Sequence, residues 1–205
     1  MSGWEKHLQT LKLPEGQPVR FWVMDESRFG LHSIVRHCWG LRGKRVIKSF
    51  QQKFDWDYVY GALDILSGEP VCCFVPTVSC DAVWEFLRQL VRTDSAAQHV
   101  VLWDGAGFHQ PPDATQEEWA DLNQVQVLKL PPYCPELNPV ERLWDQVKDA
   151  ICNRTFTTIE ALREALTPVL AGFWNCPKRV KKLIGKSWLI QNANDSYPAI
   201  LPIFN

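Results

Sequence analysis

Five short apolar segments in this chain have the composition of β-strands. Most are rich in β-branched and aromatic side chains, and one, residues 99–103, is a continuous apolar run typical of a strand buried on both faces. A turn at Ser67-Gly68 joins the second segment to the third. The five predicted strands are residues 19–24, 59–65, 70–75, 99–103 and 125–130.

Apolar residues recur at helical spacing in four other segments. The predicted helices are residues 81–93, 139–151, 157–174 and 177–186. The second has a capping-box arrangement, with Asn138 at the N-cap and Glu141 at the third helical position. The third opens with a second capping box, Thr157-x-x-Glu160, and Pro168 predicts a kink in it. Strands followed by helices in this order predict a mixed α/β fold.

Acidic residues follow two of the predicted strands, and another begins a helix. Asp25 and Glu26 follow the first strand, Asp104 follows the buried fourth strand, and Glu141 lies in the first turn of the helix after the fifth. Open α/β sheets place their sites at the carboxyl ends of strands. If the first and fourth strands are neighbours, Asp25, Asp104 and Glu141 converge.

Three converging carboxylates would repel one another and raise each other's pKa, which makes such a cluster improbable as mere structure. Mg²⁺ is a hard cation that takes carboxylate, water and phosphate oxygens, and two such ions can clamp an in-line phosphoryl displacement. We therefore expect a site for two Mg²⁺ or Mn²⁺ ions.

Simpler roles stay open for each of these residues. Glu141 suits a helix N-terminus through the cap and dipole alone, and Asp104 suits a turn before Gly105-Ala106-Gly107. Glu26 is the alternative ligand to Asp25. Four further residues are supporting candidates. His109 could instead be a core or surface histidine, and Asp145 could be an acid on a solvated helix face. The four are Glu26, His109, Asn138 and Asp145.

Composition bounds the class of protein. The chain has 205 residues, is 46% hydrophobic and contains 10 Trp and 10 Phe, which is enough for one sizeable domain. Its seven cysteines are an odd number without a CxxC pair, and no signal peptide or membrane-length apolar run is present. We expect a soluble, reduced, cytoplasmic protein with no membrane partner. A net charge of −1 neither favours nor excludes nucleic acid.

Two stretches are locally basic. Residues 27–54 contain no acidic residue, and Gly40 and Gly43 predict a hairpin tip there beside an exposed Trp39. The other stretch lies in the last predicted helix. A run of charge is often only a solvated surface, but these could bind DNA phosphates without regard to sequence. The candidates are Arg36, Arg42, Lys44, Arg45, Lys48, Lys178, Arg179, Lys181 and Lys182.

Three blocks of this sequence resemble the signature blocks of insertion-sequence DDE transposases, in the bacterial branch of the Tc/mariner superfamily. They are residues 25–29 (DESRF), 103–109 (WDGAGFH) and 130–141 (LPPYCPELNPVE), and residues 38–43 (CWGLRG) are similar to a hairpin of that family. The 36 residues between Asp104 and Glu141 suit the family's spacing, although Gly105 and Cys134 stand where many relatives have Asn and Ser.

The resemblance implies an RNase H-like fold, with a mixed central sheet flanked by helices, and a catalytic, metal-binding triad of Asp25, Asp104 and Glu141. It implies Mg²⁺ or Mn²⁺, two ions per site, as cofactor. The implied partners are double-stranded DNA, both transposon ends and target, and a second copy of the chain in a synaptic homodimer. It also implies a bacterial, nucleoid-associated location.

We expect a linker at residues 1–18, a catalytic domain at 19–190 and a tail at 191–205. Such transposases carry a helix-turn-helix region that reads the element's ends, and 18 residues are too few for one. This leaves three hypotheses open: an active transposase catalytic domain, a co-opted or decayed module that binds DNA or protein without catalysis, and a stand-alone RNase H-like nuclease.

Overall fold

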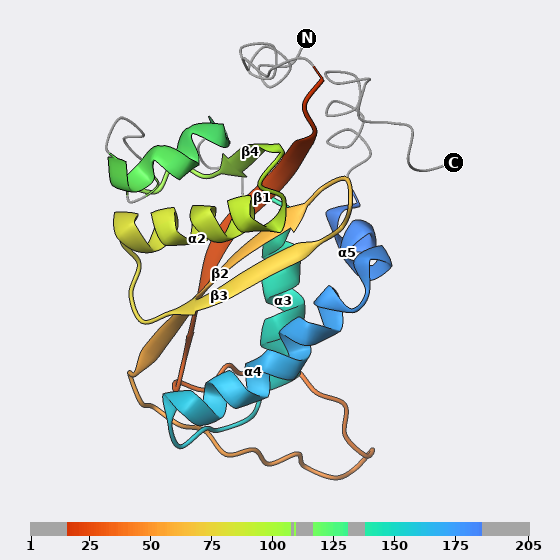
Figure 1. The fold of residues 1–205 in the computed structure, drawn as a ribbon. Coiled ribbons are helices and arrows are strands. Elements are labelled where there is room, and N and C mark those ends of the chain that lie inside the picture. The colour runs from red at the N-terminus through yellow and green to blue at the C-terminus, as the bar shows by residue number, and fades with distance from the viewer. Residues whose placement is uncertain (1–15, 108, 110–116, 131–137, 186–205) are drawn as a thin grey trace.

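The computed structural model describes residues 16–107, 109, 117–130 and 138–185. Within them, five strands form one mixed sheet in the order β3-β2-β1-β4-β5 (Figure 1). The pair β1–β2 and the pair β2–β3 are antiparallel, whereas β4 runs parallel to both β1 and β5. The first and fourth strands are therefore neighbours, as the convergence of the acids requires. The strands are β1 Val19–Gly30, β2 Trp56–Asp64, β3 Pro70–Val75, β4 Gln98–Trp103 and β5 Val125–Lys129.

Strand β1 is twice as long as its apolar run predicts. It continues to Gly30, so Asp25 and Glu26 lie inside the strand, and the prediction that they end it is wrong. The extension exists because β2 supplies backbone partners as far as the pair Gly30↔Trp56. The parallel pairing with β4 stops at Val23↔Leu102. Asp25 therefore still lies just after the part of β1 that pairs with β4.

Two hydrophobic clusters cover the two faces of the sheet. Phe21 and Val23 face one cluster, which contains the apolar sides of α3, α4 and α5. Trp22 and Met24 face the other, which contains the apolar side of α2. The alternation follows from the period of two in a strand. Strand β4 contributes to both clusters and is buried on both faces, as predicted.

Four α-helices lie among the described residues, together with a 3-10 helix, η1 Glu117–Gln124, that the sequence pattern did not predict. Helix α4 begins at Ile159, because the Thr158 side chain accepts the Ala161 N–H and is the cap, one residue after the predicted Thr157. The helix continues through Pro168. Gly185, at φ 52°, ends α5. The α-helices are α2 Cys80–Thr93, α3 Val140–Ile151, α4 Ile159–Trp174 and α5 Pro177–Ile184.

The basic segment between β1 and β2 is an exposed loop rather than a β-hairpin (Figure 1). Its two arms share few backbone hydrogen bonds, such as Ser33 N–H to Gln51 O at 3.0 Å. It does reverse near the predicted tip, where Lys44 N–H donates to Leu41 O and Gly43 has a φ of 79°. The Trp39 side chain is fully exposed.

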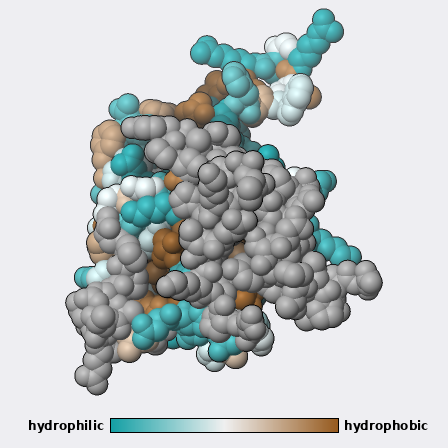
Figure 2. All heavy atoms as spheres, turned by 90° about the horizontal axis from the view of Figure 1, so that it is seen from above, coloured by the Kyte–Doolittle hydropathy of each residue, from teal (hydrophilic) through white to brown (hydrophobic). Residues whose placement is uncertain are grey.

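Among the described helices, none is long and apolar enough to cross a membrane. The described residues that are visible in Figure 2 mix hydrophilic and hydrophobic side chains. The six cysteines that the structure describes are free thiols. Most of the expected N-terminal linker, most of the third motif block and the C-terminal tail lie outside the described residues.

Candidate active site

Asp25 is buried at the centre of the sheet and is held by a helix from far along the chain. Its side chain is 8% exposed, and the indole Nε1–H of Trp144 on α3 donates to its Oδ2 across 3.0 Å. Gly61 lies opposite Asp25 on β2. A Cβ at Gly61 would come within 2.6 Å of the Trp144 ring, so the absence of a side chain there makes room for the indole.

The surroundings of Asp25 disfavour its charged form. Burial raises the pKa of this carboxyl to about 8, and the nearby carboxylates of Glu141 and Glu26 add to the rise. The hydrogen bond from Trp144 lowers the pKa of Asp25, whereas the charge of Asp104 raises it by a smaller amount than the other causes. The structure therefore brings all four acids within electrostatic reach of one buried position.

Helix α3 is fixed to β1 at the residue before Asp25. Asn138 donates from Nδ2 to the Met24 carbonyl at 3.1 Å and accepts the Val140 N–H at its Oδ1 at 3.0 Å. The bond from Val140 lies at the start of α3, which begins at that residue, and within the described residues the Asn138 N–H does not donate to the Glu141 carboxylate. The predicted capping box is therefore wrong, because Asn138 Oδ1 accepts the N–H of Val140 and not that of Glu141. Glu141 is left exposed at the start of the helix.

Asp104 follows β4, where it forms the predicted turn and also contacts His109. Its Oδ1 accepts the Ala106 N–H at 2.9 Å and lies 2.6 Å from His109 Nδ1. The hydrogen bond from His109 lowers the pKa of Asp104, and it outweighs the opposing effect of burial. This contact therefore favours the charged form of Asp104.

His109 is fully buried and bridges two acids. Its Nε2 lies 3.1 Å from Glu26 Oε2, while its ring stacks on Trp103 with centroids 5.0 Å apart. Burial lowers the pKa of His109, but the interactions with Asp104 and Glu26 outweigh it and raise the pKa to about 9. The imidazolium joins the acid at the end of β4 to an acid on β1, so His109 is neither an isolated core histidine nor a surface one.

Asp145 lies apart from this group. It pairs with Arg36 at 3.1 Å, and Asp149 binds the same guanidinium, so the two acids attach the loop after β1 to α3. Arg36 thus has carboxylate partners within the chain. Across the described residues, no three His, Cys, Asp or Glu side chains are gathered closely enough to form a ready metal site. The carboxylate of Asp104 faces His109 instead.

The remaining basic candidates lie at two separate places. Arg42, Lys44, Arg45 and Lys48 are exposed on the loop after β1. The chain has no acidic residue between Ser27 and Phe54. The others lie on α5 and are Lys178, Arg179, Lys181 and Lys182. Among them, Arg179 donates to Gln146 Oε1 at 2.8 Å and packs over the Phe173 ring.

Comparison with known proteins assigns the family. The model of the family described as DDE superfamily endonuclease matches residues 20–163, which is most of the chain. The chain belongs to this family. It is also 30% identical, over 139 residues, to the protein y4pE/y4sA of Sinorhizobium fredii, itself described as uncharacterized; the match covers 67% of this chain and 92% of that one.

Solved structures share the fold of this DDE endonuclease domain. The Mos1 transposase paired-end complex with the left transposon end has a TM-score of 0.56 at 19% identity, and the match covers 81% of this chain. The mariner Mos1 paired-end complex with Mg has a TM-score of 0.57 at 18% identity and covers 86%. This chain spans 55% and 56% of those two Mos1 chains. The RNase H-like fold expected from the resemblance is confirmed.

Two neighbours of the acids were missed in the sequence of this DDE family member. Trp144 fitted the apolar stripe of its helix, so its polar contact with Asp25 carried no separate signal. Gly61 was an ordinary strand residue. A glycine inside a strand often marks a close approach, and that signal could have identified it.

Proposed function

We propose that this chain is the catalytic domain of a DNA transposase, with Asp25, Asp104 and Glu141 as its catalytic acids. The observation that carries the proposal is the hydrogen bond from Trp144 to Asp25, because it holds the helix whose first turn contains Glu141 against the buried acid of β1. Asp104 follows β4, the parallel neighbour of β1. Membership of the DDE endonuclease family and the fold shared with Mos1 transposase support the assignment.

The donor set fits hard divalent cations. All three proposed ligands are carboxylates, the oxygen donors that Mg²⁺ and Mn²⁺ favour. Trp144 binds only Oδ2 of Asp25, and both hydrogen bonds to Asp104 use Oδ1. One oxygen of each acid is thus without a hydrogen bond from the described residues. Mos1 complexes with Mg and with Mn share this fold.

Two bound ions would activate water and stabilise the charge that develops in an in-line phosphoryl displacement. The chain's own residues would orient the site. Trp144 and Asn138 fix Asp25 and the start of α3, and His109 keeps Asp104 ionised. Water would cut the DNA at the element's ends, and the freed 3′-hydroxyl would then attack target DNA. This route needs no covalent enzyme intermediate, so no nucleophilic side chain is assigned.

The proposal extends to partners and boundaries. The exposed cations on the loop after β1 and on α5 would contact phosphates, and a second copy of the chain would join the complex with DNA. The Mos1 structures that share the fold include a paired-end complex with the left transposon end. Residues 19–190 would form the catalytic domain between the flanking segments 1–18 and 191–205.

Metal-dependent cutting and joining of DNA tests this function. Wild type should nick supercoiled plasmid with Mg²⁺ or Mn²⁺, and it should join a duplex with a free 3′-hydroxyl to a target plasmid. Asp25→Asn, Asp104→Asn and Glu141→Gln should each reduce both reactions by about 100-fold or more, since changes to residues that merely support metal ligands cost about 10–100-fold. Glu164→Gln, an exposed acid on α4, is the control and should act as wild type.

Calorimetry separates binding from catalysis. Mn²⁺ should bind wild type and bind Glu141→Gln much more weakly, while both proteins melt alike without metal. Equal binding would reduce Glu141 to a residue of the helix start and overturn the assignment. Nicking without joining would favour a stand-alone nuclease. DNA binding without any cutting would favour a non-catalytic module.

A further inference from the structure

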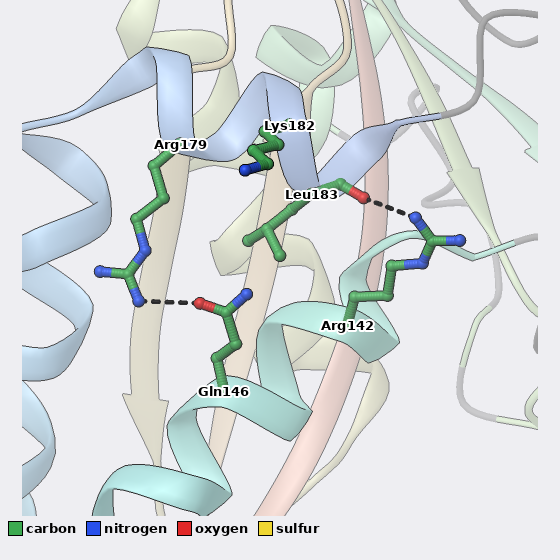
Figure 3. A pocket seen from close by; sticks show the side chains of 5 residues that line it. All are labelled: Arg142, Gln146, Arg179, Lys182 and Leu183. Carbon is green, nitrogen blue, oxygen red and sulfur yellow. Dashed lines mark hydrogen bonds between the residues drawn. The ribbon is translucent and has the colours of Figure 1, made fainter.

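A cationic cavity lies between α3 and α5. It has a volume of about 410 Å³, and three of its five lining residues are Arg or Lys while none is acidic. Figure 3 shows Arg142 reaching from α3 to α5 and Arg179 reaching from α5 to α3. The lining residues are Arg142, Gln146, Arg179, Lys182 and Leu183.

Neutral acceptors hold the two arginines of this cavity. Arg142 donates from Nη1 to the Leu183 carbonyl at 3.1 Å, and Arg179 donates from Nη2 to Gln146 Oε1 at 2.8 Å. Such bonds fix each guanidinium without neutralising it. Several other arginines of the chain are compensated by carboxylates, as Arg163 is by Asp57. The cavity therefore keeps its positive charge.

The geometry suits phosphate groups. A guanidinium has five N–H donors in a planar fork that matches phosphate oxygens, and one hydrogen bond to the protein leaves several of them for a ligand. Lys182 adds a compact charge from the next turn of α5 and is exposed. The two fixed guanidinium groups and the Lys182 ammonium repel one another, and an anion in the cavity relieves that repulsion.

One residue that lines the cavity, Arg142, is next in sequence to the proposed catalytic acid Glu141. Arg142 follows Glu141 in the first turn of α3, and Gln146 lies one turn further along the same helix. A nucleic acid strand that presents one phosphodiester to the acids would therefore carry its neighbouring phosphates toward α5.

We propose that the cavity between α3 and α5 binds backbone phosphates of the DNA strand whose adjacent phosphodiester lies at the acidic site. This rests on the proposed function for the position of the strand, and it adds the path that the strand takes. Because the contacts reach phosphate and not bases, the site contributes affinity without sequence preference.

Equilibrium binding of a short fluorescent duplex, measured in EDTA at a series of salt concentrations, tests the proposal. Lys182→Glu is the informative variant because it leaves both arginine hydrogen bonds in place. Arg92→Glu, an exposed residue on α2 across the sheet, makes the same change in net charge and is the matched control. Lys182→Glu should weaken binding at least about 10-fold and make the slope of log K against log salt shallower by about 0.9 per lost phosphate contact. The control should keep the slope of wild type.

Equal effects of the two variants would overturn the proposal, since only net charge would then matter. A second variant, Lys182→Gln, should give a smaller loss in the same direction, and a normal melting curve for each variant excludes misfolding as the cause. Titration of inorganic phosphate into the protein without DNA separates the sources of the anion. Phosphate binding that Lys182→Glu abolishes, with DNA binding unchanged, would assign the cavity to a free anion and contradict the proposal.

The outcome is separable from that of the proposed function. The duplex assay needs no metal and no cutting, so an inactive protein whose DNA affinity still depends on Lys182 would reject the transposase and keep the phosphate site. An active protein whose DNA affinity does not depend on Lys182 would support the transposase and reject the phosphate site.

Discussion

The indole of Trp144 donates a hydrogen bond to Asp25 across 3.0 Å and joins two segments that are 119 residues apart in the chain. Trp144 lies three residues after Glu141, so both project from the first turns of α3. One buried contact therefore fixes the distance between the strand that carries one proposed acid and the helix that carries another. In known metal sites, hydrogen bonds from neighbouring side chains orient the ligands in this way.

Trp144→Phe should weaken metal binding without abolishing the fold. Phenylalanine keeps an aromatic ring in the core but removes the N–H that orients the Asp25 carboxylate. We expect Mn²⁺ affinity, measured by calorimetry, to fall about 10–100-fold. Trp174→Phe, at a partly exposed tryptophan of α4, should leave it unchanged. Unchanged affinity in Trp144→Phe would show that the hydrogen bond has no orienting role.

Gly61→Ala should destabilise the protein, because the new Cβ would lie 2.6 Å from the Trp144 ring. The free energy of unfolding should fall by about 1–3 kcal/mol in urea denaturation, as expected for overpacking of a core. Gly105→Ala is a matched control, since a Cβ there meets nothing within 4 Å. Similar stabilities of the two variants would mean that the indole can move away at little cost.

Without metal, stability should decline as the pH rises from about 4 to about 8. The pKa of Asp25 is raised from 3.8 to about 8 in the folded protein, so the folded state binds more protons than the unfolded state in this range. Its stabilising proton is fully present below pH 3.8 and is lost through pH 8. Asp25→Asn should flatten the decline in melting temperature between these values.

His109 extends that decline to higher pH. Its pKa is raised from 6.5 to about 9, so the imidazolium stabilises the fold below pH 6.5 and this contribution is lost as the pH passes 9. Asp25→Asn should therefore retain a decline between pH 6.5 and about 9. In His109→Gln the decline over this upper range should be weaker than in wild type. An unchanged profile would show that His109 does not hold its proton more tightly on folding.

Divalent metal should raise the melting temperature of wild type. A ligand that binds only the folded state, at a concentration of 100 times its dissociation constant, stabilises by about 2.7 kcal/mol. Mn²⁺ should therefore shift the unfolding curve of wild type and of Glu164→Gln, but shift that of Glu141→Gln much less. A shift of the same size in all three proteins would place the bound metal away from Glu141.

The sequence by itself determined the positions of most strands and helices and the mixed α/β class. Local patterns suffice for this, because the alternation of Phe21 and Trp22 between two cores and the stripe of Leu143 and Val147 depend only on strand and helix periodicity. Asp25, Asp104 and Glu141 were also identified from the sequence, and Asp104 does follow a strand and Glu141 does lie in the first turn of a helix, whereas Asp25 lies inside β1.

Only the tertiary structure decided how these acids are held. Strand β1 extends through Asp25 because β2 supplies its backbone partners, and Asn138 ties the start of α3 to Met24 of β1. Asp104 meets His109, and Asp25 meets Trp144. Apart from the Asp104–His109 bond, these contacts join distant segments. A local pattern indicates which residues are polar or helical, but the free energy of each such contact depends on a partner that only the fold brings within reach.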